Sequence, residues 1–202
     1  MHPLIIISGP AGVGKTTVAK ALLKTFPALH SSVTYTTRRR REFSTEDKKM
    51  YYVSRPEFER RRDAGEFLEW ATVHGDYYGT HREETLAVLN HNPVIFNIDV
   101  QGAEQLMKQF GRRAVSVFLL PESHEQMVDH IKNRGEMTEG DFQARLKSAE
   151  RELTAKDRFD YQVINAEGRL NETMDKIAGI IKPYLLRGEG PHQGIDRTAS
   201  TG

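Results

Sequence analysis

The feature that most constrains the fold is a glycine-rich stretch near the start of the chain, "GPAGVGKTT", residues 9–17. It follows an apolar run, "LIIIS" (4–8), and precedes a segment of helical period that begins near Lys15. The stretch matches the G-x-x-x-x-G-K-[ST] pattern in the setting that this pattern needs, between a strand and a helix. The alternative is a chance glycine-rich turn, and the flanking segments argue against it. We therefore expect a phosphate-binding loop between a first strand and a first helix.

Each residue type in this loop has a physical reason. Gly9, Gly12 and Gly14 let the backbone turn so that successive N–H groups converge on phosphate oxygens, and the helix adds its positive N-terminus. Lys15 supplies a point charge for the outer phosphates, and the Thr16 hydroxyl is suited to coordinate Mg²⁺. The predicted ATP-binding residues are Gly9, Pro10, Ala11, Gly12, Val13, Gly14, Lys15, Thr16 and Thr17.

The rest of the chain alternates short apolar runs with longer segments of helical period. Strands are expected at 4–8, 94–98, 115–120 and 161–165, and helices at about 15–26, 101–110, 123–133, 139–156 and 169–186. Strands separated by helices indicate an α/β fold, with a parallel β-sheet core flanked by helices on both faces. In such folds ligands bind at the carboxyl edge of the sheet, where the phosphate loop is expected.

Two segments interrupt this alternation. Residues 32–83 carry short β-like runs, "SVTYTT" and "MYYVS", and a helix that begins near Pro56, which indicates an insertion. Residues 134–147 are polar and arginine-bearing, and they interrupt the alternation a second time. We expect one domain over 1–186, with its core formed by 1–31, 84–133 and 148–186. The tail, 187–202, contains Gly, Pro, Ser and Thr but almost no apolar residues, and it is expected to be disordered.

Composition narrows the partners and the compartment. The 202 residues include 29 basic and 28 acidic side chains, a net charge of +1, so phosphate binding must come from local clustering. The chain has no cysteine, which excludes disulfides and thiolate metal sites. Its first apolar run is too short for a signal peptide or a membrane span. We expect a cytoplasmic globular protein, monomeric or homodimeric, with small-molecule partners and with neither a nucleic-acid nor a membrane partner.

A run of four arginines, residues 38–41, follows the segment "TYTT". The usual interpretation of such a run is a solvated basic loop or a nucleic-acid patch. In an extended chain only alternate side chains share a face, so two or three guanidinium groups at most can meet one ligand. Two such groups fit a phosphate monoester dianion, because each donates a pair of hydrogen bonds. Beside a phosphate loop, the run indicates a clamp for the phosphate of a second substrate.

The segment "GEFLEWATVHGDYYGT", residues 65–80, places Glu69 inside an apolar run. A carboxylate offers two adjacent acceptors, which match the N1–H and N2–H₂ donors of guanine. Adenine would set a lone pair against the carboxylate, and a buried charge left unpaired is costly. The alternative is a glutamate in an amphipathic strand or helix end, paired with a surface lysine. Read alone, Glu69 favours that alternative.

Two further candidates have alternatives of their own. Asp99 ends a predicted strand, where it is suited to orient Mg²⁺ through water, to contact the acceptor nucleotide, or to cap the helix that follows. Tyr77 and Tyr78 are both suited to a core. Alternation directs one of them inward and the other toward the site, and we assign Tyr78 to the ligand.

Five segments together resemble one protein family. "GPAGVGKTT", "TTRRRR", "GEFLEWATVHGDYYGT", "IDVQGA" and "RLKSAERE" occur in the order and spacing of guanylate kinases. The resemblance runs from about residue 4 to 183, and "GEFLEWA…GDYYGT" is its most specific part. It implies a P-loop NTPase fold, in which 32–83 forms the NMP-binding insertion and 134–147 forms a lid. The implied reaction is the reversible, Mg-dependent transfer of the ATP γ-phosphoryl group to GMP, and to dGMP.

The resemblance also implies roles for individual residues. The phosphate of GMP would be bound by arginines and a tyrosine, and its base by Glu69 with neighbouring polar groups. The implied GMP-binding residues are Thr34, Arg38, Arg41, Glu69, Tyr78, Thr80 and Asp99, and the implied catalytic residues are Lys15, Arg41, Arg134 and Arg145.

Some positions depart from the family pattern. Met50 stands where a tyrosine hydroxyl normally contacts the acceptor phosphate, and the adjacent Tyr51 should point to the opposite face. Asn97 replaces a carboxylate, and His130 replaces an arginine at the base of the lid. Met50 and Asn97 support an alternative function, a kinase of the same fold for another small phosphorylated acceptor. A non-catalytic binding module is a further alternative, which the complete phosphate loop argues against.

Overall fold

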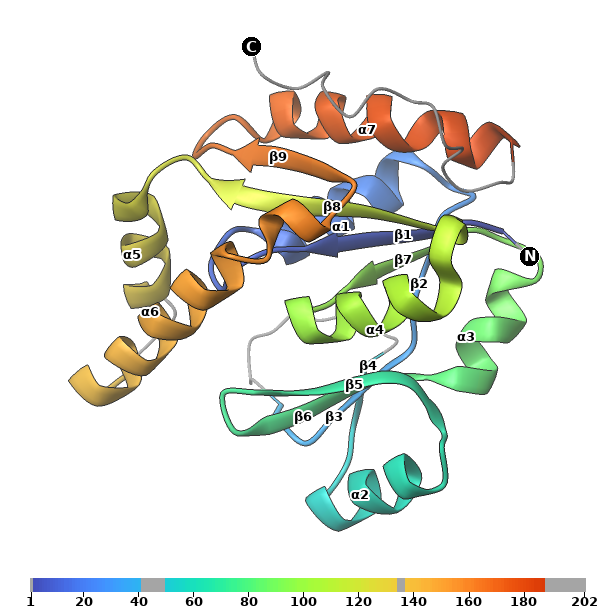
Figure 1. The fold of residues 1–202 in the computed structure, drawn as a ribbon, viewed down its shortest axis with the longest axis horizontal. Helices are drawn as coiled ribbons and strands as arrows, with labels where there is room; N and C mark the ends of the chain where they lie inside the picture. Colours follow the sequence, from blue (N-terminus) through green and yellow to red (C-terminus); the bar gives the residue numbers. More distant parts are fainter. Residues whose placement is uncertain (1, 41–49, 134–136, 188–202) are drawn as a thin grey trace.

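The computed structural model describes residues 2–40, 50–133 and 137–187 (Figure 1). Its main sheet has five parallel strands in the spatial order β2-β7-β1-β8-β9. These strands are β1 (Leu4–Ser8), β2 (His30–Ser31), β7 (Val94–Asn97), β8 (Ala114–Pro121) and β9 (Tyr161–Asn165). Strand β1 lies in the middle, so the loop that follows it opens at the centre of the carboxyl edge.

Helices cover both faces of this sheet, as predicted. Ile5 and Ile7 point to one face, where they pack with α1 (Lys15–Thr25) and α7 (Leu170–Arg187). Leu4 and Ile6 point to the other face, toward α3 (Arg82–Leu89) and α4 (Val100–Phe110). Alternate side chains of β1 therefore belong to two apolar clusters, which explains why its sequence is apolar without a break.

Two helices beyond the carboxyl end of β8 form a smaller unit (Figure 1). Helix α5 (His124–Lys132) packs on α6 (Glu139–Leu153), and Ile131 and Phe142 are buried between them. Thr138 and Asp141 form a capping box that fixes the start of α6. Two short 3₁₀ helices complete the core, η1 (Gly111–Arg113) and η2 (Lys156–Arg158).

A second sheet of four strands lies beside the core (Figure 1). Its spatial order is β4-β3-β6-β5, formed by β3 (Thr34–Thr36), β4 (Met50–Tyr52), β5 (Phe67–Val73) and β6 (Asp76–His81). Strands β5 and β6 form a hairpin, whose two turn residues, His74 and Gly75, both have positive φ. Helix α2 (Arg55–Asp63) covers one face through Phe58, which stacks on Phe67 at 4.5 Å.

The sequence predictions for the core are confirmed, and those for the insertion were incomplete. All four predicted core strands and all five predicted helices occur, with ends that differ from the prediction by at most three residues. Strand β2, helix α3 and the hairpin β5–β6 were not predicted. The second sheet lies inside the predicted insertion, 32–83, but the division of the chain into core, insertion and lid stays a prediction. The predicted tail lies outside the described residues, apart from Arg187, which ends α7.

Within the described ranges, none of the helices combines the length and the apolar content needed to cross a bilayer.

The second sheet depends on one aromatic side chain. Phe58 is fully buried against Phe67 and Tyr77, so Phe58→Ala should lower the free energy of unfolding by about 3–5 kcal/mol. Leu186→Ala is the control, because Leu186 is 78% exposed and should change the value by less than about 0.5 kcal/mol. Urea unfolding of both variants measures the difference. Equal values for the two would contradict this account of the sheet.

Candidate functional site

The phosphate loop joins β1 to α1 through three glycines with positive φ, at positions 9, 12 and 14. A Cβ at Gly9 would lie 2.5 Å from the carbonyl oxygen of Leu119, and one at Gly14 would lie 2.5 Å from Nδ2 of Asn165. Both the left-handed backbone and the close approach of neighbouring strands therefore require glycine. The loop has the shape that the sequence pattern predicts.

The side chains at the start of α1 contact the phosphate loop and the end of β7. Lys15 Nζ donates to the carbonyl oxygens of Gly9, at 2.5 Å, and Pro10, at 2.9 Å. Thr16 is exposed, and its Oγ1 accepts a hydrogen bond from Nδ2 of Asn97 at 3.2 Å. Asn97, the residue that replaces a carboxylate of the family, thus lies beside the predicted Mg²⁺ ligand.

Two side chains that the sequence analysis did not assign to the site hold the loop from behind. Asn165, at the end of β9, donates from Nδ2 to the carbonyl oxygen of Val13 at 2.8 Å. His130 of α5 lies with Nδ1 2.9 Å from the carbonyl oxygen of Gly12. A carbonyl oxygen only accepts, so Nδ1 carries the hydrogen. These contacts join residues more than 100 positions apart, so no local sequence pattern predicts them.

A third missed residue is Glu152, near the end of α6. Its carboxylate accepts hydrogen bonds from Ser148 Oγ, at 3.1 Å, and from the backbone N–H of Ala11 in the phosphate loop. Burial raises the pKa of Glu152, and the nearby charge of Lys15 opposes that shift. Glu152 follows Arg145 by two helical turns, a spacing that sets both on one side of α6. The seven-residue spacing from Arg145 could therefore have identified Glu152 in the sequence.

The second sheet brings the predicted guanine-reading residues into one row. Thr34 of β3 pairs with Thr80 of β6, and Thr80 pairs with Glu69 of β5. Tyr78 lies two residues before Thr80 on the same strand, so it shares their face. Four of the predicted acceptor residues thus lie on one face of the sheet.

Glu69 is buried in this row, with 4% of its surface exposed. Thr80 Oγ1 donates to Glu69 Oε1 at 2.6 Å. Burial raises the pKa of Glu69 to about 7, the hydrogen bond from Thr80 opposes the rise, and the charge of Asp99 adds to it. Lysine and arginine are absent from the described groups that act on its charge. The alternative of a surface lysine pair is therefore not supported.

Asp99 links this row to the phosphate loop. It caps α4, because Oδ1 accepts from the backbone N–H of Gly102 at 2.9 Å. Burial raises the pKa of Asp99, and the charge of Lys15 lowers it. The capping alternative is therefore realised, while the same carboxylate acts electrostatically on both Lys15 and Glu69.

The strand that carries Met50 offers one more hydroxyl. Met50 pairs with Thr34, so it shares the face of the row. Tyr51 stacks on Tyr35 at 4.9 Å on the opposite face, as predicted. Tyr52 returns to the face of Met50, and it was not among the predicted site residues.

The predicted arginines are only partly described. Arg38 follows β3 and is half-buried, and its backbone N–H donates to Thr36 Oγ1 at 3.2 Å. Arg145 lies on α6 and is half-buried. Arg41 and Arg134 lie outside the described residues. The described part of the chain therefore does not test the predicted grouping of Lys15, Arg41, Arg134 and Arg145.

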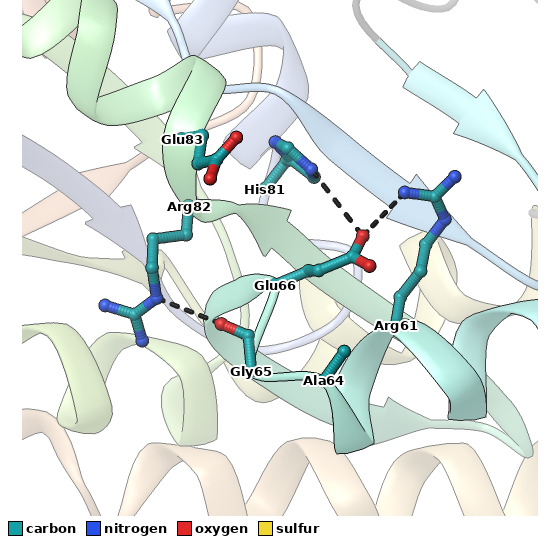
Figure 2. Close-up of a pocket in the computed structure, with 7 residues that line it drawn as sticks. All are labelled: Arg61, Ala64, Gly65, Glu66, His81, Arg82 and Glu83. Carbon is teal, nitrogen blue, oxygen red and sulfur yellow. Dashed lines mark hydrogen bonds and ion pairs between the residues drawn. The ribbon is translucent and has the colours of Figure 1, made fainter.

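A separate pocket of about 420 Å³ lies between the end of α2 and the junction of β6 with α3 (Figure 2). Figure 2 shows Glu66 between Arg61, at 2.7 Å, and His81, at 3.9 Å, while Arg82 donates to the carbonyl oxygen of Gly65 at 3.1 Å. These contacts pair Arg61, Glu66 and Arg82 within the protein, and none of the predicted site residues lines the pocket. We assign it no ligand.

Comparison with known proteins gives consistent matches. The guanylate kinase family profile matches residues 1–184. The guanylate kinase of Rhizobium johnstonii is 37% identical over 194 residues, which is 96% of this chain and 87% of that protein. The guanylate kinase of Bartonella quintana is 40% identical over 178 residues, which is 88% of this chain and 79% of that protein.

Solved structures agree with these matches. The crystal structure of guanylate kinase from Anaplasma phagocytophilum matches with a TM-score of 0.73 at 30% identity, over 92% of this chain and 87% of that chain. A shikimate kinase from Bacteroides thetaiotaomicron matches with a TM-score of 0.52 at 15% identity, over 90% of this chain and 99% of that chain. The second match concerns the fold alone, and it agrees with the predicted α/β P-loop architecture.

The raised pKa of Glu69 makes the stability of the protein depend on pH. An unfolded glutamate ionises near pH 4.5 and Glu69 near 7, so between these values the unfolded chain loses the proton first. The free energy of unfolding should therefore fall as pH rises from 4.5 to 7, by up to about 3 kcal/mol from this residue. Urea unfolding of the wild type and of Glu69→Gln across this range isolates the effect. Parallel curves for the two proteins would show that Glu69 titrates normally.

Proposed function

The chain belongs to the guanylate kinase family, and we propose that it transfers the γ-phosphoryl group of ATP reversibly to the phosphate of GMP, giving ADP and GDP. The observation that carries the proposal is the buried carboxylate of Glu69 in a row with Thr34 and Thr80. The proposal extends to dGMP, to a cytoplasmic location and to a monomeric or homodimeric state.

Glu69 suits guanine for a geometric reason. Thr80 donates to one carboxylate oxygen, Oε1, and each such oxygen accepts more than one hydrogen bond. The two oxygens together match the adjacent N1–H and N2–H₂ donors of guanine, and a base without these donors leaves the buried carboxylate poorly satisfied. Thr34 and Thr80 offer hydroxyls in the same row, and Asp99 offers a further acceptor. These features support recognition of guanine rather than adenine, uracil or cytosine.

The phosphate of GMP is assigned to the next part of the same face. Tyr78 lies there, and Arg38 and Arg41 follow β3 in the sequence. Tyr52 is added to the residues assigned to this phosphate. It pairs with Thr36, which pairs with Tyr78 on its other side. Its hydroxyl compensates for the one that Met50 lacks. The acceptor phosphate is a dianion, so no strong general base is required for its attack.

The transfer itself then requires alignment and neutralisation of charge. The phosphate loop and Lys15 hold the donor phosphates, while Arg41, Arg134 and Arg145 are proposed to meet the transferring group. Asn165, His130 and Glu152 fix the loop so that its N–H groups keep their orientation. No covalent enzyme intermediate is part of this scheme.

Magnesium is part of the proposal. Among residues 2–40, 50–133 and 137–187, no three His, Cys, Asp or Glu side chains cluster in a way that would hold a metal ion. Thr16 and the neighbouring Asn97 amide fit an ion that takes most of its ligands from nucleotide phosphates and water. Bound with ATP, Mg²⁺ neutralises charge on the outer phosphates.

ADP formation from Mg-ATP with GMP, dGMP, AMP, UMP and CMP, offered separately, tests the proposal. We expect turnover with GMP and dGMP alone. Glu69→Gln should lower kcat/KM for GMP on the order of 10²- to 10⁴-fold, because one acceptor becomes a donor that faces a donor of guanine. Turnover with another monophosphate and none with GMP would favour the alternative, a kinase for a different acceptor.

A second prediction concerns the donor side. Asn165→Asp keeps the size of the side chain but sets an oxygen against the carbonyl oxygen of Val13. A penalty of about 1–3 kcal/mol for these two unpaired acceptors should raise the KM for ATP tenfold or more, with the KM for GMP nearly unchanged. Asn171→Asp on the exposed side of α7 is the matched control. Equal KM values for ATP in both variants would remove Asn165 from the donor site.

A further inference from the structure

Strand β5 is an edge strand of the second sheet, and a helix of the core lies along its open side (Figure 1). An edge strand leaves backbone N–H and C=O groups without a strand partner. Here Gln105 of α4 meets both groups of Trp70: its Nε2 donates to the carbonyl oxygen at 2.8 Å, and its Oε1 accepts from the N–H at 3.3 Å. The side-chain amide thus pairs with β5 as the peptide group of a neighbouring strand would.

A second glutamine extends this pairing. Gln101 lies one turn before Gln105 on the same face of α4, and its Nε2 donates to the carbonyl oxygen of Thr72 at 3.3 Å. Trp70 and Thr72 are two residues apart, so their carbonyl groups point the same way. Helix α4 therefore fixes both the register and the distance of β5.

The carboxylate of Glu69, the residue before Trp70, lies against the same helix. Gly102 is the point of contact: a Cβ there would overlap Oε2 of Glu69 and would lie 3.0 Å from its Cδ. The φ of Gly102 is not positive, so the helix backbone alone does not demand glycine at this position. The space that the missing Cβ leaves is occupied by the carboxylate of Glu69.

We propose that the first turns of α4, through Gln105, Gln101 and Gly102, are positioning elements that set the place of Glu69 and so the selectivity for guanine. The proposal rests on the proposed function, since it assigns Glu69 to the base. It explains how a carboxylate on the inserted sheet is held in register with Asp99, which begins α4 in the core. Paired hydrogen bonds to a planar base need such fixed geometry.

Gly102→Ala is the sharpest test. Alanine is compatible with the helix, but its Cβ must displace the carboxylate of Glu69. The KM for GMP should rise at least tenfold, while kcat at saturating GMP and the KM for ATP stay within about twofold. The ratio of kcat/KM for GMP to that for IMP should fall, because IMP lacks the N2 donor that Glu69 reads.

Gly179→Ala is the matched control. Gly179 is also helical, in α7, and a Cβ there meets nothing within 4 Å. This variant should keep wild-type values for both substrates and for the ratio of GMP to IMP.

Gln105→Leu tests the hydrogen-bonded part of the proposal. It removes the pairing with Trp70 while keeping a side chain of similar length, and Gln109→Leu, one turn later on α4, is its control. We expect a smaller rise in the KM for GMP, about threefold to tenfold, and again a lower ratio of GMP to IMP.

Two results would overturn the proposal. One is a wild-type KM for GMP and a wild-type selectivity ratio in both Gly102→Ala and Gln105→Leu. The other is an equal loss of kcat, ATP affinity and thermal stability, which would show a general structural role. A wild-type protein that phosphorylates another monophosphate and not GMP would refute the proposed function instead. The KM for that acceptor in Gly102→Ala and Gly179→Ala would then decide the positioning role separately.

Discussion

Strand β1 is buried along its whole length, and its alternate side chains belong to two apolar clusters on the two faces of the main sheet. Its apolar side chains on both faces suit a position in the middle of a sheet that helices cover on both sides. The loop that follows β1 begins at the carboxyl edge of the sheet. There its backbone lies close to Leu119 of β8 and to Asn165 of β9. Because a Cβ would lie too close to these neighbours, the loop has glycines with positive φ at positions 9 and 14. The place and the shape of the phosphate loop thus follow from the packing of one strand.

The core could be predicted from the sequence because its strands are continuous apolar runs and its helices are long. The hairpin β5–β6 could not. Its register shifts between Phe67 and Glu69, so three successive residues, Phe67, Leu68 and Glu69, are all buried. Leu68 reaches the cluster of the main sheet, while Phe67 packs under α2. This bulge removes the period-two pattern by which a strand is recognised, and it also turns Glu69 toward the core.

The candidate site divides in a similar way. Lys15 follows from the phosphate-loop motif, whereas Glu69 read alone favours a surface pair, and the row of hydroxyls is implied only by the resemblance to guanylate kinases. Asn165 and His130 could not be predicted, since they act by hydrogen bonds to backbone carbonyls of a loop that is distant in sequence. The departures at Met50 and Asn97 were visible in the sequence, but only the register of the second sheet identifies Tyr52 as the neighbouring hydroxyl.

Asp99 connects the charge of the phosphate loop with the charge of Glu69 in the second sheet. One carboxylate caps α4, and its charge interacts with that of Lys15 in the phosphate loop and with that of Glu69 in the second sheet. The charge of Lys15 lowers the pKa of Asp99, and the charge of Asp99 raises the pKa of Glu69, so one carboxylate connects the electrostatics of the phosphate loop with those of the second sheet. Electrostatic coupling of this kind is reciprocal, so a change at either end acts on the other with the same free energy. A single helix cap thus lies between the charge of the phosphate loop and the buried carboxylate of the second sheet.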